Sequence, residues 1–255
     1  MTDTRAQREW RQRERAEYRS AAITARVLHW MLQCGLPTPL LLTGHRIVRD
    51  ELDHAELSRA TWQALGAGEM AVAYDVAELD LPMAAEGPLA SLLDGTLRAF
   101  CIGETLAVPL FDAMLRRAAV PAAAIALRRI AADERVHRAF GWTVLGAIQE
   151  QDPQGTAARV EATLPAVLTG FRAAYAQAAP GPPLTEQERD AGLLDAADYR
   201  SIFYRCLDED IRPRLQRLSL PTSAVEEMLA DHAPDTSLPS DEQSTPPVER
   251  DERVR

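Results

Sequence analysis

Asp-Glu-Leu-Asp-His occupies residues 50–54 and Asp-Glu-Arg-Val-His occupies residues 133–137, so the pattern Asp-Glu-x-x-His occurs twice in the chain. The Glu and the His of each copy are three residues apart, which places them on one face of an α-helix. A single pair with this spacing is usually an exposed helical pair. Two copies, each near the middle of a long helix, indicate that both belong to one shared site.

The sequence around these two strings is typical of long amphipathic helices. Ala, Leu, Arg and Glu dominate, and apolar residues recur at intervals of three and four. Proline and glycine residues end the helical segments, and Pro109 is expected to kink one of them. We therefore predict an all-α protein with four long helices, at about residues 7–34, 38–65, 89–118 and 121–150.

The lengths of the connections predict how these helices pair. Short connections follow the first and third helices, so the four form two antiparallel hairpins, and the longer connection at residues 67–88 allows a crossover between them. Two further helices, at about residues 157–178 and 196–217, are expected to cover the bundle. We place the helical domain at residues 1–220 and expect the acidic segment 221–255 to form a disordered tail.

Both Glu–His pairs are predicted to face the interior of the bundle. They share their helix faces with large apolar residues, among them Ile47 and Trp62 in the second helix and Leu127 and Ile130 in the fourth. A carboxylate that is buried without a partner costs several kcal/mol or becomes protonated. An interior that contains several carboxylates therefore needs a compensating cation.

The first and third helices each supply one more glutamate to this interior. Glu104 stands on the apolar stripe of the third helix, and Glu17 lies near the centre of the stripe of the first. Glu14 is the nearest alternative to Glu17, but it projects about 60° away from Glu17 and off the axis of the stripe. We therefore select Glu17 and leave Glu14 out of the site.

The complete set resembles the metal ligands of the ferritin-like di-iron carboxylate superfamily, in which two helices each give a Glu and two each give a Glu-x-x-His. The resemblance covers about residues 14–150 and follows the expected chain order. It implies a four-helix bundle with two additional C-terminal helices and Glu51 and Glu134 as bridging ligands. It implies that two iron ions are held by six residues: Glu17, Glu51, His54, Glu104, Glu134 and His137.

An aspartate precedes the glutamate in each copy of the motif. Asp50 and Asp133 resemble the residues that hold the second imidazole nitrogen of a ligand histidine in relatives with this string. Which histidine each aspartate serves stays open. A mixed manganese and iron pair also stays open, because carboxylate and imidazole ligands suit several first-row metals.

Within the superfamily the ligands alone do not settle the reaction. A storage-cage subunit is shorter than this chain, and the peroxide-reducing relatives with a rubredoxin-like domain need paired Cys-x-x-Cys motifs, which are absent here. The resemblance then implies an O2-dependent di-iron oxidase or oxygenase that hydroxylates, desaturates or N-oxygenates a small-molecule substrate. Its electrons come from an external donor or reductase, because no nucleotide-binding glycine motif is present. The alternative is an iron-binding or ferroxidase protein without an organic substrate.

Composition limits the classes of binding partner and the cellular compartment that we expect for this protein. All 28 basic residues are Arg, they alternate with acids, and the formal net charge is −10, which disfavours nucleic acid as a partner. The N-terminal residues lack the apolar segment of a secretory signal, and no stretch resembles a membrane span. We expect a cytoplasmic protein without nucleic-acid or membrane partners. A homodimer stays open.

Overall fold

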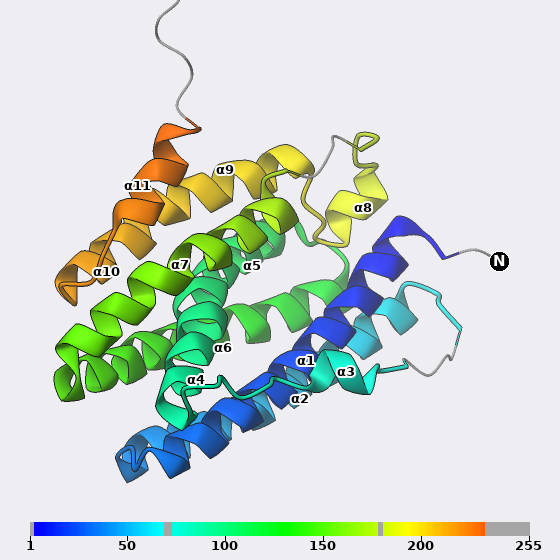
Figure 1. The fold of residues 1–255 in the computed structure, drawn as a ribbon. Helices are drawn as coiled ribbons and strands as arrows, with labels where there is room; N and C mark the ends of the chain where they lie inside the picture. The colour runs from blue at the N-terminus through cyan, green and yellow to red at the C-terminus, as the bar shows by residue number, and fades with distance from the viewer. Residues whose placement is uncertain (1–2, 69–72, 178–180, 233–255) are drawn as a thin grey trace, which may run out of the picture.

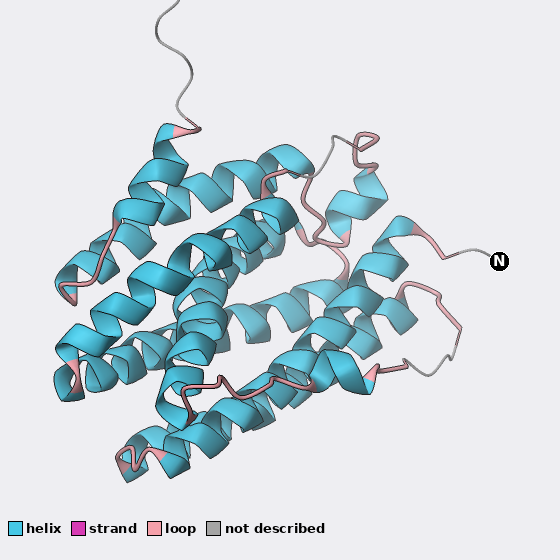
Figure 2. Cartoon of the chain, viewed as in Figure 1, coloured by secondary structure: helices cyan, strands magenta, loops and turns pink. Residues whose placement is uncertain are grey.

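The computed structural model describes residues 3–68, 73–177 and 181–232, and the regular structure within them is helical (Figure 1, Figure 2). The predicted all-α class is therefore confirmed. The first hairpin consists of α1 (Arg5–Gln33) and α2 (Thr38–Ala64), and the second pairs a composite third helix with α6 (Pro121–Gln151). A short helix, α3 (Val76–Leu79), lies in the crossover between the hairpins and packs against α1.

Local sequence accounts for the ends of the first hairpin. Thr4 and Gln7 form a reciprocal capping box that starts α1. Gly35 follows α1 with a φ of 66°, a conformation that glycine adopts at little cost, and Pro39 lies in the first turn of α2. α1 and α2 then run side by side over most of their length (Figure 1).

The third bundle helix is composite. It consists of α4 (Pro88–Gly95), the π-helical segment η1 (Thr96–Glu104) and α5 (Thr105–Arg117). We predicted a kink at Pro109. The departure from α-helical geometry lies instead in η1, before this residue, and Pro109 itself lies inside α5. Proline lacks the N–H that would bond to the Thr105 carbonyl, and the thiol of Cys206 donates to that oxygen instead, at 3.3 Å.

The π-helical segment packs very closely on α6. A Cβ atom at Gly141 would lie 2.3 Å from the Cβ atom of Phe100 and 2.9 Å from its backbone carbonyl carbon. Only glycine allows this approach, because neither backbone nor Cβ can move aside as a flexible side chain would. The contact fixes the segment that ends at Glu104.

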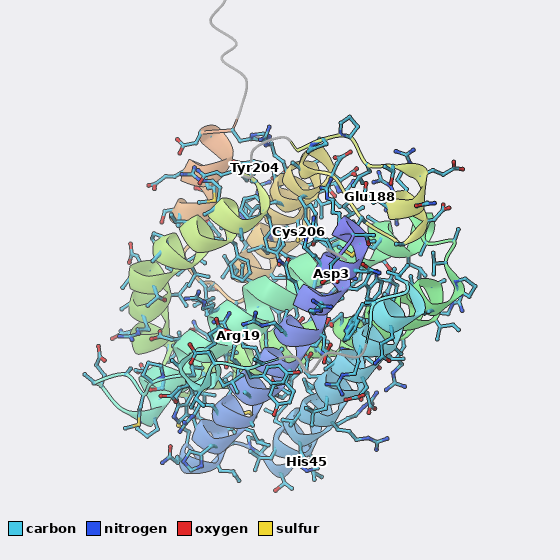
Figure 3. The ribbon with its side chains drawn as sticks, turned by 90° about the vertical axis from the view of Figure 1, so that its right-hand side faces the viewer. Asp3, Arg19, His45, Glu188, Tyr204 and Cys206 are labelled. Carbon is cyan, nitrogen blue, oxygen red and sulfur yellow. The ribbon has the colours of Figure 1, made fainter. Side chains whose placement is uncertain are left out.

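The chain after the bundle folds back over it (Figure 1). The two predicted extra helices correspond to α7 and to the run from α9 through α10, with Cys206 at the end of α9 (Figure 3). The helical elements are α7 (Pro153–Tyr175), α8 (Glu186–Asp190), α9 (Ala196–Cys206), the π-helical η2 (Leu207–Ile211), α10 (Arg212–Arg217) and α11 (Ser223–Ala230).

The predicted start of the tail at residue 221 is wrong. α11 lies inside the segment assigned to the tail and packs on α7 and η2. Val225 and Met228, three residues apart on one face, are buried in the larger apolar cluster, and this burial stabilises so short a helix. The rest of the predicted tail, residues 233–255, lies outside the described residues.

Two apolar clusters fill the interior. The larger one contains Phe100 and joins the bundle to α7 and the C-terminal helices, and the smaller one contains Trp10 and Trp62 and joins the start of α1 to the segment around α8. Among the described residues, no helix combines the length and the apolar character that crossing a membrane requires.

Candidate metal centre

The structure brings all six predicted ligands together inside the bundle. They come from four different segments: α1, α2, η1 and α6. The exposed fraction of these residues lies between 0% and 8%, so acidic groups and imidazoles that water would normally solvate are buried.

These residues form two overlapping groups of four. The first group contains Glu17, Glu51, His54 and Glu134, and the second contains Glu51, Glu104, Glu134 and His137. Within each group, one potential ligand atom per residue lies within 4.8 Å of the others. Glu51 and Glu134 belong to both groups, which is the arrangement that a bridging pair between two ions requires.

Both imidazoles turn their Nδ1 atoms toward the shared carboxylates. His54 Nδ1 lies 3.7 Å from a Glu51 oxygen and 3.6 Å from a Glu134 oxygen. His137 Nδ1 lies 3.3 Å from Glu51 and 3.1 Å from Glu134. The ring centroids are 5.7 Å apart. Nδ1 is therefore the nitrogen that each histidine would offer to an ion.

The opposite nitrogens point at the two predicted aspartates. His54 Nε2 donates to Asp133 at 3.2 Å, and His137 Nε2 lies 3.5 Å from Asp50. Each aspartate thus lies against the Nε2 atom of the histidine on the other helix. A carboxylate on Nε2–H fixes the tautomer and leaves a lone pair on Nδ1.

Two arginines that the sequence analysis missed link the aspartates. Arg129 lies 2.5 Å from Asp133 and 3.3 Å from Asp50, and Arg46 lies 3.3 Å from Asp50 and 3.8 Å from Asp133. Each arginine precedes its own aspartate by four residues, so the full repeat is Arg-x-x-x-Asp-Glu-x-x-His. This longer repeat could have identified the two arginines from the sequence. The arginines balance the charge of the aspartates and hold α2 against α6.

The electrostatics of the centre show an excess of buried negative charge. Burial, followed by the charges of Glu134 and Glu51, raises the pKa of Glu104 well above its usual range. Burial and Glu51 likewise raise the pKa of Glu134. Burial opposes the charged form of Glu51, but the nearby imidazoles of His137 and His54 lower the pKa of Glu51 to about 2. Burial opposes the charged form of His54, yet the neighbouring carboxylates raise its pKa to about 12.

Unpaired polar atoms at the centre fit two divalent cations. Both carboxylate oxygens of Glu51 and Nδ1 of His54 are buried without a hydrogen-bond partner among the described residues. Such atoms are costly unless something coordinates them. Four carboxylates match the charge of two divalent ions, and the mixed carboxylate and imidazole set suits first-row metals such as iron.

Glu14, which the sequence analysis left out, lies outside both groups although it is fully buried. Its carboxylate accepts hydrogen bonds from Trp62 Nε1 at 2.6 Å and from Arg59 Nε at 2.8 Å. These partners satisfy its charge locally. Its burial is therefore explained without a metal.

We expect Asp133→Asn to weaken ferrous binding about tenfold to a hundredfold, because a neutral amide holds the His54 tautomer less firmly. Anaerobic ferrous titration measures the affinity. Asp112→Asn is the matched control, since Asp112 pairs with Arg135 at 2.7 Å and does not contact the centre. Equal affinities for Asp133→Asn and the wild type would show that the Asp133 contact does not support metal binding.

Comparison with known proteins supports the fold. No protein-family model matches the chain, and no curated protein matches it. Among solved structures, it is similar to protein 19 with aldehyde deformylating oxidase activity from Synechococcus, with a TM-score of 0.54 and 16% sequence identity, over 89% of this chain and 98% of that one. The predicted ferritin-like fold is thereby confirmed. At this identity the similarity concerns the fold alone.

Proposed function

We propose that the protein is a non-haem di-iron oxidase or oxygenase that uses dioxygen to oxidise a small organic molecule. The observation that carries the proposal is the pair of overlapping groups that share Glu51 and Glu134. Glu17 and Glu104 complete them as terminal ligands, one in each group. The oxidase activity of the Synechococcus protein with the same fold supports this reaction class.

The six side chains would hold the two iron ions, which supply electrons that activate dioxygen. Asp133 and Asp50 orient the two imidazoles through Nε2. The buried setting excludes water, which protects reactive species from side reactions. Substrate oxidation supplies only half of the electrons that reduce dioxygen to water, so an external electron donor is part of the proposal.

Anaerobic ferrous titration followed by exposure to oxygen tests the proposal. We expect about two irons per chain, ferric absorption in the near ultraviolet after oxygen is added, and a rise in melting temperature. Ligand at a hundred times its Kd adds about 2.7 kcal/mol per site, or about 5–10 °C for a chain of this length. Absence of stoichiometric binding would mean that the buried carboxylates are structural or hold another metal.

A second measurement separates an oxygenase from an iron-sequestering protein. Cell extracts incubated with the loaded protein, a chemical reductant and oxygen are compared with extracts that lack the protein. We expect an organic compound to be consumed in the first set alone. Iron loading far beyond about two ions per chain, with no compound consumed, would favour sequestration.

A further inference from the structure

Arg13 is a half-buried arginine that forms no ion pair with any carboxylate in the described part of the chain. Its guanidinium carbon lies 4.3 Å from the ring centre of Trp10 and 5.4 Å from that of Phe111, and its Nη2 donates to the Met114 sulfur at 3.1 Å. A guanidinium has five N–H donors, and a thioether is a weak acceptor. The apolar contacts therefore hold the side chain in place and leave most of its hydrogen-bonding capacity unused.

The arginines on either side of Arg13 in the sequence have charged partners. Arg11 pairs with Asp3, near the N-terminal end of the helix (Figure 3), at 2.5 Å. Arg15 pairs with Glu78 at 3.1 Å. Arg13 lies between them in sequence and points to a different surface of the helix.

Arg13 lies close to the candidate metal centre. It precedes Glu17 by one helical turn, on the same face of α1. Phe111, which contacts the guanidinium, follows Glu104 by two turns. Burial raises the pKa of Glu17, and the positive charge of Arg13 is among the influences that oppose the rise. The guanidinium thus lies within electrostatic range of a predicted ligand.

A row of aromatic rings lies between the segment η1 and the smaller apolar cluster. Phe171 stacks on Tyr175 with ring centroids 6.0 Å apart, and Tyr175 stacks on Tyr199 at 5.9 Å. One end of the row lies against η1, because a Cβ atom on Gly103, the residue before Glu104, would lie 3.6 Å from Phe171. Its other end packs on the smaller apolar cluster, which also contains the Trp10 and Met114 neighbours of Arg13.

Two of the six predicted ligands, Glu17 and Glu104, are slightly less buried than the other four. Glu104 is 8% exposed and Glu17 is 6% exposed, whereas the other four predicted ligands are at most 2% exposed. Burial and the neighbouring Tyr199 raise the pKa of Tyr175 to about 12. The charges of Glu104 and Glu17 contribute to that rise, so the phenol lies within electrostatic range of both predicted ligands. The side chains of Arg13 and of the aromatic row are themselves partly exposed.

We propose that Arg13 binds the carboxylate of the substrate and that Phe111, Phe171, Tyr175 and Tyr199 contact its apolar part. This inference rests on the proposed function and names the substrate class: a small carboxylic acid with an apolar or aromatic body. One guanidinium forms a bidentate pair with one carboxylate. A phosphate dianion would need more positive charge than the contacts of Arg13 with Trp10, Phe111 and Met114 provide.

Calorimetric titration with matched probes tests the inference. The probes are octanoate and 3-phenylpropionate, each compared with the alcohol of the same carbon skeleton, on metal-free and on anaerobic iron-loaded protein. We expect at least one acid to bind about tenfold to a hundredfold more tightly than its alcohol. Arg13→Met should abolish this preference in both forms and leave the iron stoichiometry unchanged. Arg13→Lys keeps the charge and should retain part of the preference.

Arg11→Met is the matched control, because Arg11 lies on the same helix and also stacks on a tryptophan ring, 4.8 Å from Trp62. It should keep the wild-type preference. Failure of both acids to bind, or an undiminished preference in Arg13→Met, would overturn the inference. If Arg13→Met does not fold, a wild-type preference in Arg13→Lys overturns it instead. Failure to load iron is a separate result that bears on the proposed function.

Discussion

Glu51→Ala is expected to lower bound iron from about two ions per chain to less than one and to abolish iron-dependent oxygen consumption. Glu51 oxygens lie 3.7 Å from His54 Nδ1 and 3.3 Å from His137 Nδ1. Because Glu51 belongs to both four-residue groups, its loss removes a ligand from each metal position at once. Glu17 belongs to one group, so Glu17→Ala should retain about one ion. Iron per chain after desalting and an oxygen electrode provide the two measurements.

Asp53→Ala is the control for that experiment. Asp53 lies two residues after Glu51 on α2 but points outward, where its half-exposed carboxylate lies 3.9 Å from Arg49. It should load iron as the wild type does. Full loading of Glu51→Ala would remove Glu51 from the site. An equal loss in both variants would show that damage to α2, and not loss of a ligand, caused the effect.

Gly141→Ala is expected to destabilise the protein by about 3 kcal/mol or more, because the added methyl group has no space against Phe100. A backbone shift between α6 and the π-helical segment is the only relief, and it would displace Glu104, where that segment ends. For a chain of this length we expect the melting temperature to fall by about 6–12 °C. Urea unfolding and thermal melting measure the loss, and ferrous titration measures the effect on Glu104.

Gly146→Ala provides the matched control on the same helix. Its Cβ would meet Leu218 at 3.6 Å, an ordinary contact. Replacing a glycine in a helix interior by alanine should then stabilise the protein by about 0.5–1 kcal/mol. Two variants of the same chemistry would thus shift stability in opposite directions. A Gly141→Ala variant as stable as the wild type would contradict the close packing of Phe100 on α6.

Local chemistry explains why much of the bundle could be predicted from the sequence. Gly35, Pro121 and Pro153 mark the ends of helices, so the predicted ends lie within a few residues of the observed ones. The Glu–His pairs could be identified because their motif is repeated. Glu17 was distinguished from Glu14 by helical phase, and the structure places only Glu17 in the cluster.

The features that the sequence did not indicate depend on contacts between distant segments. The π-helical segment has no local signature, and its position relates to the space at Gly141. α11 is too short to be stable alone, so its formation depends on the burial of Val225 and Met228. The sequence could not predict which aspartate lies against which histidine either. That choice depends on how the helices pack in the bundle.

The exchange of partners between Asp50 and His137 and between Asp133 and His54 would couple metal capture to folding. Neither hairpin contains a complete half of the centre, because each histidine is oriented by the helix of the other hairpin. A nascent chain with its hairpins still apart therefore has no preorganised place for a metal ion. On the proposed function, tight capture would wait until both hairpins have packed together, because the exchanged contacts form only then.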